Sequence, residues 1–274
     1  MTIRLLVSVR NVDEALLAAG GGADFIDLKE PGQGALGGLP LAMIGSIVTA
    51  LRARHPGLPI SATIGDVPMV ALHDIQARVL AVAACGVDLV KVGIDSGPHA
   101  GAVLDSLAGC GHAVVPVFIA DHGISAGLWQ QALALPLAGL MIDTADKRAG
   151  SLFDVLSSAD LAALLAQARA AGRLCGLAGA LRLPHLARLR ELAPDFAGFR
   201  SAVCDVDRSG ALVPARLAAL VQALRGPAGD GLALVGEQAD GALAAQASAA
   251  LPGVALRSRP PLINSDRTAA RSAL

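Results

Sequence analysis

Lysine is rare in this chain, and its three occurrences are the residues best suited to covalent chemistry. Of the 22 basic residues, 19 are arginines and three are lysines: Lys29, Lys91 and Lys147. A desolvated lysine amine can lose its proton and act as a base or nucleophile, whereas the arginine guanidinium stays protonated. A GC-rich coding sequence would also favour arginine. Composition alone leaves both explanations open, so the positions of the lysines must decide.

The elements that must position these lysines alternate between short β-branched runs and Ala/Leu-rich segments of helical period. Strands are predicted at 3–9, 24–29, 59–64, 88–93, 113–119, 139–143, 174–178 and 197–200. Helices are predicted at 12–20, 40–54, 71–85, 98–109, 125–134, 159–171, 181–192 and 214–225. Eight strand–helix units in about 225 residues predict an α/β fold, a TIM (β/α)8 barrel. A doubly wound sheet is the alternative, but residues 8–11 lack its glycine-rich first turn.

All three lysines map to the same end of the predicted barrel. Lys29 ends the second strand, Lys91 lies near the end of the fourth, and Lys147 follows the sixth. In this fold the active site lies at the carboxyl ends of the strands. Residues two apart on a strand share a face, so Asp27 is expected beside Lys29. Converging ammoniums and burial lower a lysine pKa toward neutrality, as formation of a Schiff base requires.

A second carboxylate and two loops complete the candidate site. Asp143 ends the sixth strand after an apolar run, although a capping or turn role is the alternative for it. Barrels commonly bind phosphate with the loops after strands seven and eight, through backbone N–H groups, a helix N-terminus and a basic side chain. The residues predicted here for phosphate binding are Gly179, Ala180, Arg200, Ser201 and Ala202. Packing alone also explains small residues in such loops.

Composition and charge exclude several classes of protein. Hydrophobic residues make up 54% and charged residues 16% of the chain, which excludes disorder over most of its length. The net charge of −1, with no Tyr and one Trp, argues against nucleic acid or an anionic membrane as partner. The four cysteines form no CxxC pair and the six histidines have no metal-ligand spacing, so no metal and no cofactor are expected. Without a secretory signal or membrane-span pattern, the protein is expected to be cytoplasmic.

The pattern of elements changes near residue 226. We predict a catalytic barrel domain at 1–225 and a Gly/Ala/Pro-rich, partly disordered extension at 226–274.

Several sequence blocks resemble a known family. They are Ser-Val-Arg-Asn-Val-Asp-Glu-Ala at 8–15, Gly-Ala-Asp-Phe-Ile-Asp-Leu-Lys-Glu-Pro at 22–31, Gly-Ala-Leu-Gly at 34–37, Ser-Ala-Thr-Ile-Gly-Asp-Val-Pro at 61–68, Val-Lys-Val-Gly at 90–93 and Ile-Asp-Thr-Ala-Asp-Lys at 142–147. Over residues 3–225 the chain resembles the (5-formylfuran-3-yl)methyl phosphate synthases of methanofuran biosynthesis. These are also called 4-(hydroxymethyl)-2-furancarboxaldehyde-phosphate synthases. One departure is the eighth-strand loop, which usually reads Arg-Gly-Ala-Ala-Cys and here reads Arg-Ser-Ala-Val-Cys at 200–204.

The resemblance implies a TIM-barrel lyase similar in mechanism to class I aldolases. Its members condense two molecules of glyceraldehyde 3-phosphate, with loss of water and one phosphate, to a furan aldehyde phosphate. Lys29 then matches the Schiff-base lysine and Lys91 the acid–base group. Asp27, Asp143 and Lys147 match further active-site positions, and Ser8 is predicted as a substrate-binding residue.

Two other functions remain open from the sequence. One is a different Schiff-base aldolase for another phosphosugar, and the other is a non-catalytic barrel that binds a phosphometabolite. The partner expected in each case is a small phosphorylated molecule, and a homo-oligomer is left open.

Overall fold

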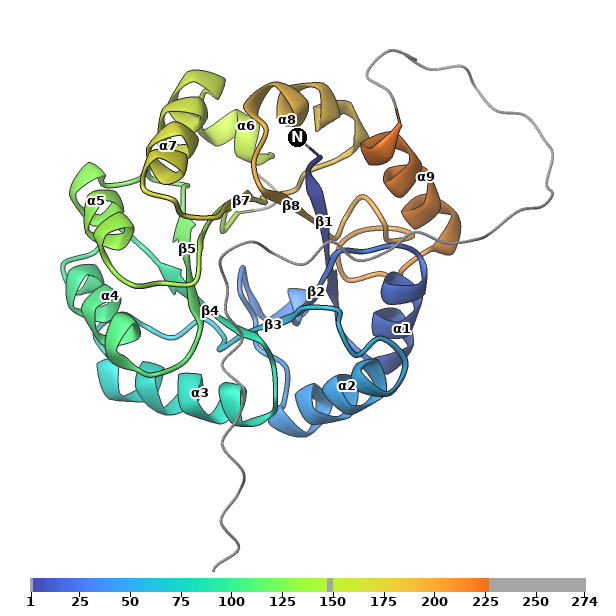
Figure 1. Cartoon of the computed structure of the whole chain (residues 1–274), viewed down its shortest axis with the longest axis horizontal. Coiled ribbons are helices and arrows are strands. Elements are labelled where there is room, and N and C mark those ends of the chain that lie inside the picture. Colours follow the sequence, from blue (N-terminus) through green and yellow to red (C-terminus); the bar gives the residue numbers. More distant parts are fainter. Residues whose placement is uncertain (1, 147–149, 227–274) are drawn as a thin grey trace, which may run out of the picture. The chain divides into compact units, whose positions relative to one another are not determined.

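The chain folds into a closed barrel of parallel strands surrounded by helices (Figure 1). A computed structural model describes residues 2–146 and 150–226. The strands are β1 (Arg4–Val9), β2 (Phe25–Leu28), β3 (Ile60–Thr63), β4 (Leu89–Ile94), β5 (Val114–Ile119), β6 (Leu140–Asp143), β7 (Cys175–Leu177) and β8 (Phe196–Phe199). They pair in chain order, and β8 pairs with β1 to close the ring. The predicted TIM (β/α)8 barrel is confirmed.

The helices cover the outside of the barrel. They are α1 (Val12–Gly20), α2 (Leu41–Arg54), α3 (Leu72–Ala84), α4 (Ala100–Gly109), α5 (Ala126–Ala134), α6 (Leu152–Val155), α7 (Ser158–Ala170), α8 (Leu186–Leu192) and α9 (Pro214–Arg225), with two 3₁₀ turns, η1 (Pro31–Gln33) and η2 (Leu183–His185). Polar side chains start several of them: Asn11 accepts a hydrogen bond from the backbone of Glu14, and Ser157 accepts one from Asp160. These caps fix where each chain segment turns away from the sheet.

Two helix predictions differ from the structure. The helix expected at 181–192 begins as the 3₁₀ turn η2 and becomes α-helical only at Leu186, because Ala180 has a left-handed φ of 45° and Pro184 follows in the first turn. The short helix α6 was not expected. It forms because Ser151 and Asp154 make a capping box, and it ends where Leu156 becomes extended.

Alternation along the strands creates two apolar layers. One set of buried side chains faces the helices, and a smaller set fills the barrel interior. Inside the barrel the rings of Phe25 and Phe196 lie 5.6 Å apart between centroids. Leu36, from the loop between β2 and α2, closes this inner layer at the carboxyl end of the strands. Any site at that end therefore rests on a packed apolar layer.

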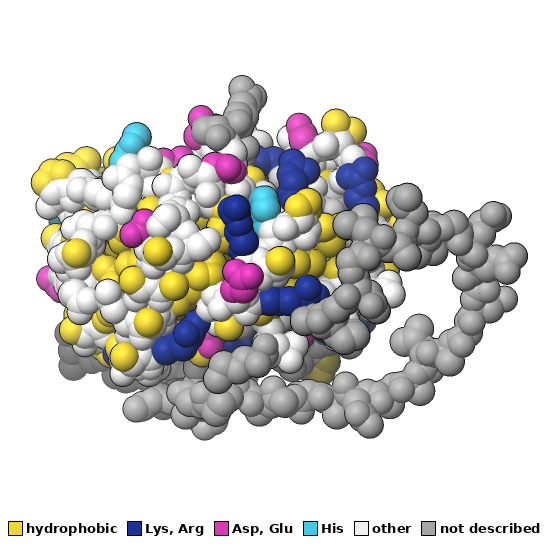
Figure 2. Space-filling view, turned by 90° about the horizontal axis from the view of Figure 1, so that it is seen from above, with side chains coloured by type: hydrophobic (Ala, Val, Ile, Leu, Met, Phe, Trp, Pro, Cys, Tyr) yellow, Lys and Arg dark blue, Asp and Glu magenta, His cyan; other side chains and the backbone are white. Residues whose placement is uncertain are grey.

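One face of the described part of the molecule is drawn with its side chains coloured by type in Figure 2. On the face drawn in Figure 2, acidic and basic side chains lie among apolar and neutral ones. Within residues 2–146 and 150–226, no helix is long and apolar enough to cross a membrane.

Candidate active site

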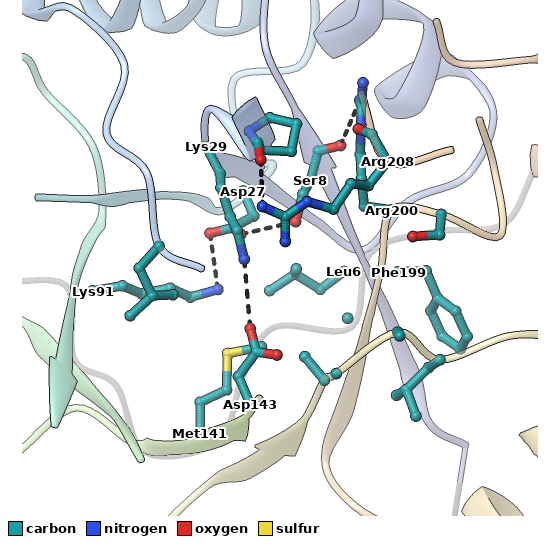
Figure 3. A pocket seen from close by; sticks show the side chains of 18 residues that line it. Leu6, Ser8, Asp27, Lys29, Lys91, Met141, Asp143, Phe199, Arg200 and Arg208 are labelled. Carbon is teal, nitrogen blue, oxygen red and sulfur yellow. Dashed lines mark hydrogen bonds and ion pairs between the residues drawn. The ribbon is translucent and has the colours of Figure 1, made fainter. Parts of the chain in front are cut away.

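A pocket opens at the carboxyl ends of the strands, where the sequence placed the chemistry. It is lined by residues of β1, β2, β4, β6 and β8 and by the loops that follow β2, β7 and β8. Figure 3 shows Lys29, Lys91, Asp27 and Asp143 pointing toward one another across it. The predicted parity is confirmed, because Asp27 and Lys29 both line this pocket.

Asp27 and Lys91 form a buried ion pair on the barrel floor. The Lys91 Nζ lies 2.8 Å from Oδ1 of Asp27, and both side chains are at most 4% exposed. Asp27 also accepts hydrogen bonds from the hydroxyls of Ser8, at 3.0 Å, and Ser61, at 2.7 Å. A buried carboxylate needs such partners because the interior does not solvate its charge. Ser8, predicted as a substrate-binding residue, lines the pocket with its hydroxyl directed at Asp27.

The surroundings shift the protonation of this pair. Burial lowers the pKa of Lys91 below its ordinary value of 10.5, and the nearby ammonium of Lys29 lowers it further; Asp27 partly opposes both. Burial alone would raise the pKa of Asp27, but the two ammoniums and Ser61 outweigh it and hold that pKa below 3.8. Lys91 can therefore give up a proton more easily than an exposed lysine, beside a carboxylate that stays ionised.

Lys29 and Asp143 face the same pocket from β2 and β6. The Lys29 Nζ lies 3.4 Å from Oδ2 of Asp143, whose other oxygen accepts a hydrogen bond from the backbone N–H of Thr144 at 2.7 Å. The side chain of Lys29 is 11% exposed, against 3% for Lys91. Lys29 is thus the amine that a molecule entering the pocket meets first.

The loops after β7 and β8 present small residues and free backbone N–H groups. Gly179, with φ of 111°, and Ala180, with φ of 45°, are both left-handed. An added Cβ at Gly179 would lie 3.0 Å from Thr144, so a larger residue there would crowd Thr144 and strain the backbone. Among the described residues, the backbone N–H groups of Gly179, Ala180, Ser201 and Ala202 donate to no protein acceptor. Gly179, Ala180 and Ser201 line the pocket.

Arg200 lines the pocket but is fully engaged by the protein. Its Nη1 and Nη2 donate to both oxygens of Glu14, at 2.6 and 3.1 Å, and its remaining N–H groups donate to the carbonyls of Ser8, Arg208 and Gly210. All five N–H donors are used. Arg200 therefore holds the loop after β8 in place, and direct contact with a phosphate would require it to release one of these acceptors.

One charged residue that lines the pocket was missed by the sequence reasoning, and one predicted residue falls outside the described ranges. Arg208, in the loop between β8 and α9, lines the pocket. It stands eight positions after Arg200, whereas the sequence prediction covered only the first residues of that loop. A second arginine in the same loop was the signal that could have identified it. Lys147 lies outside the described residues, in the gap at 147–149.

The site combines two amines with two carboxylates above a packed apolar layer. An accessible amine can attack a carbonyl, and a buried amine of lowered pKa can move protons next to it. In the described ranges, no three His, Cys, Asp or Glu side chains are grouped so that they could hold a metal ion.

Comparison with known sequences gives a consistent set of relatives. The family model of 4-HFC-P synthase matches residues 5–221. A Methylorubrum extorquens protein that carries the name (5-formylfuran-3-yl)methyl phosphate synthase provisionally is 38% identical over 229 residues, covering 83% of this chain and 94% of its own length. The (5-formylfuran-3-yl)methyl phosphate synthase of Archaeoglobus fulgidus is 33% identical over 238 residues, covering 82% of this chain and all of its own length.

Comparison with solved structures supports the fold alone. Phosphoribosyl anthranilate isomerase from Thermus thermophilus superposes with a TM-score of 0.57 at 18% sequence identity, covering 81% of this chain and 98% of that one.

Proposed function

The chain belongs to the 4-HFC-P synthase family, and on that premise we propose that it condenses two molecules of glyceraldehyde 3-phosphate to (5-formylfuran-3-yl)methyl phosphate. One phosphate and two molecules of water leave in the net reaction, which makes the enzyme a carbon–oxygen lyase. The product then serves as a precursor of a methanofuran-type cofactor. The synthase names of the relatives support the product, and the pocket supports the chemistry.

The observation that carries the mechanism is the pairing of an accessible lysine with a buried one. Lys29 is exposed to the pocket, and Lys91 lies beneath it with a lowered pKa. A Schiff-base enzyme needs one amine to bond the substrate and a second group to move protons at the neighbouring carbon.

The first half of the reaction uses Lys29 as nucleophile. Its neutral amine adds to the carbonyl carbon of one triose phosphate, and water leaves to give an iminium ion. The iminium withdraws electrons from the adjacent carbon, so neutral Lys91 can take a proton there and leave an enamine. Asp27 stabilises the Lys91 ammonium so formed, since it is ionised and 2.8 Å away.

The second half joins the two substrates. The enamine carbon attacks the aldehyde of the second triose phosphate, and the Lys91 ammonium supplies a proton to the new hydroxyl. Ring closure at the iminium carbon expels the Lys29 amine, and the net loss of one phosphate and two water molecules completes the furan. Asp143 orients Lys29, from which it is 3.4 Å distant, and the N–H groups of the loops after β7 and β8 hold a substrate phosphate.

Reductive trapping tests the proposal. Purified protein is incubated with glyceraldehyde 3-phosphate and borohydride, and the modified peptide is identified by mass spectrometry. We expect an adduct on Lys29, and without borohydride a product that absorbs in the near ultraviolet. An adduct with an aldol product would favour a different phosphosugar aldolase. If neither an adduct nor turnover is found, a phosphometabolite-binding barrel is the function that remains.

A further inference from the structure

Arg208 lies at the turn of a hairpin-like loop that follows β8. Cys204 and Leu212 form an antiparallel bridge, and the N–H of Asp205 donates to the carbonyl of Ala211 at 3.0 Å. The carbonyls of Arg208 and Gly210 accept hydrogen bonds from Arg200, which is itself bound to Glu14. The backbone that carries Arg208 is therefore held in place by Arg200.

The side chain of Arg208 reaches across the pocket to the loop between β2 and α2. Its Nη2 donates to the carbonyls of Pro31 and Gly34, the latter at 2.7 Å. Figure 3 shows the guanidinium over the pocket that Lys29 and Ser8 also line. Its Nε and Nη1 donate to no protein acceptor in the described part of the chain, so three N–H donors remain for a ligand.

The loop that receives Arg208 is equally fixed. Gly34 has a φ of 104°, and an added Cβ would lie 1.9 Å from the carboxylate of Asp66. That carboxylate accepts the N–H of Leu36 at 3.1 Å, and the N–H of Glu30 donates to the carbonyl of Gly37 at 2.8 Å. The guanidinium is thus held between two ordered loops before any ligand arrives, which lowers the entropy lost on binding.

The charge balance of the pocket singles out the same residue. Four cationic side chains line it among the described residues: Lys29, Lys91, Arg200 and Arg208. The first three each form an ion pair, with Asp143, Asp27 and Glu14 respectively. Arg208 forms no ion pair with a described carboxylate, and its hydrogen-bond acceptors are neutral carbonyls. The carboxylate of Asp207, which interacts with its charge, is exposed and accepts a hydrogen bond from the backbone of Ser209. Its charge is available to an anion.

We propose that Arg208 binds the phosphate of the second triose phosphate, while the N–H groups after β7 and β8 bind the first. This inference rests on the proposed function, which brings two phosphate dianions into one pocket. Two dianions repel each other, so each needs its own positive or N–H-rich site. The Nη1 N–H groups and the fixed positive charge of the guanidinium suit a phosphate oxygen, since hydrogen bonds between charged groups are the stronger ones.

The test uses glycerol 3-phosphate, which carries the phosphate but no carbonyl and cannot form an imine. Isothermal titration of the full chain should show two sites per chain in the wild type. Arg208→Gln should weaken one site by about tenfold or more, the loss expected for hydrogen bonds to a charged group, and leave the other unchanged. Arg208→Lys should retain part of that affinity, because it keeps the charge without the Nε and Nη1 donors. The matched control is Arg54→Gln, at the exposed end of α2.

Three outcomes would overturn the inference: a single site in the wild type, unchanged binding in Arg208→Gln, or loss of both sites in both Arg208 variants. The last result would assign Arg208 to loop structure instead. Absence of a furan product from glyceraldehyde 3-phosphate would refute the proposed function, yet two glycerol 3-phosphate sites that depend on Arg208 would still stand.

Discussion

Opposing electrostatic effects act on the pKa of Lys91, and their balance decides whether its amine is neutral or charged. Burial and the Lys29 ammonium favour the neutral amine, while Asp27 and, more weakly, Asp143 favour the ammonium. A residue in this position changes its protonation state when a neighbouring charge changes. Removing one carboxylate should therefore alter the pH dependence of the reaction and not only its rate.

Replacing Asp27 with Asn should move the acidic limb of the pH–rate profile to lower pH. The limb reports the pH above which Lys91 is neutral and able to accept a proton. Asp27 raises the pKa of Lys91, so its loss lowers that pKa, and the neutral amine persists to lower pH. Steady-state rates across pH for both proteins measure this shift. A limb that stays in place or moves to higher pH contradicts the assignment of Lys91 as the base.

Arginine should fail at both pocket lysines, but in different ways. Lys29→Arg should abolish borohydride trapping and lower turnover by at least about 10³-fold, since the guanidinium forms no imine. Lys91→Arg should still be trapped at Lys29 while turnover falls by about 10²–10⁴-fold, the usual contribution of a general base. Mass spectrometry and a product assay separate the two. Trapping that survives in Lys29→Arg would refute the nucleophile.

The sequence predicted these residues through strand parity and strand ends, but not their partners. Asp27 and Lys29 share a face because they are two apart, which any strand guarantees. That Lys91 pairs with Asp27 and Lys29 with Asp143 depends on the stagger of the strands around the barrel, which no local pattern encodes. For the same reason the engagement of Arg200 by Glu14 could not be predicted.

At the scale of elements, the barrel interior is filled to its limit next to β7. Gly176 on β7 faces the ring of Phe196 on β8, and an added Cβ would lie 2.0 Å from that ring. The ring in turn packs on Phe25. The strand thus keeps a glycine where a side chain would displace the inner layer beneath the pocket.

Gly176→Ala should destabilise the fold by about 1–3 kcal/mol or more, the usual range for overpacking a core. Gly45→Ala is the matched control, because Gly45 lies within α2 and an added Cβ there meets nothing within 4 Å. That change should stabilise the fold by about 0.5–1 kcal/mol through helix propensity. Urea unfolding of the two variants gives the comparison. Equal stabilities would mean that Phe196 can move aside.

The element boundaries that sequence reasoning missed lie where backbone conformation is unusual. Ala180 is left-handed without being glycine, so the expected helix at 181–192 starts late. No propensity rule predicts such a residue, because its strain of about 1–2 kcal/mol is offset by the surrounding structure. The late start leaves a loop, rather than a helix N-terminus, at the predicted phosphate site.

For the molecule as a whole, one buried ion pair joins the beginning of the barrel to its end. Glu14 on α1 accepts two hydrogen bonds from Arg200, which directly follows β8, while β8 itself pairs with β1. Burial alone would raise the pKa of Glu14, but Arg200 and Arg10 outweigh it and hold that pKa below 4.5. Closure of the ring is therefore linked to an ionised carboxylate.

Glu14→Gln should lower the free energy of unfolding at neutral pH by about 3 kcal/mol. It should also make that free energy less dependent on pH in the acidic range. Because the folded-state pKa of Glu14 lies below 4.5, the unfolded chain binds its proton first as pH falls. The stability that Glu14 contributes is thus present above pH 4.5 and lost below it, and the variant lacks this loss. Thermal unfolding from pH 7 to 3 measures it, with Asp13→Asn on the same helix as an exposed control.

A chain ending at residue 226 should keep the activity within about twofold. The ring of strands and α9 are complete at Arg225, and the family match ends at residue 221. We therefore propose 1–225 as the catalytic domain. Product formation by the shortened and full chains, at equal protein concentration, decides this. Circular dichroism checks separately that the shortened chain is folded. A large loss of activity in a folded shortened chain would assign part of the site to residues beyond the barrel.

The scarcity of lysine gives this enzyme an unusual vulnerability to selective reagents. Both lysines of the described residues line the pocket, and only Lys29 reaches its solvent. Apart from Lys147, the remaining basic side chains are arginines, which do not form stable imines with aldehydes. A phosphorylated aromatic aldehyde, reduced in place, would therefore label the pocket with few competing surface amines. The same property makes Lys29 a natural anchor for a covalent inhibitor.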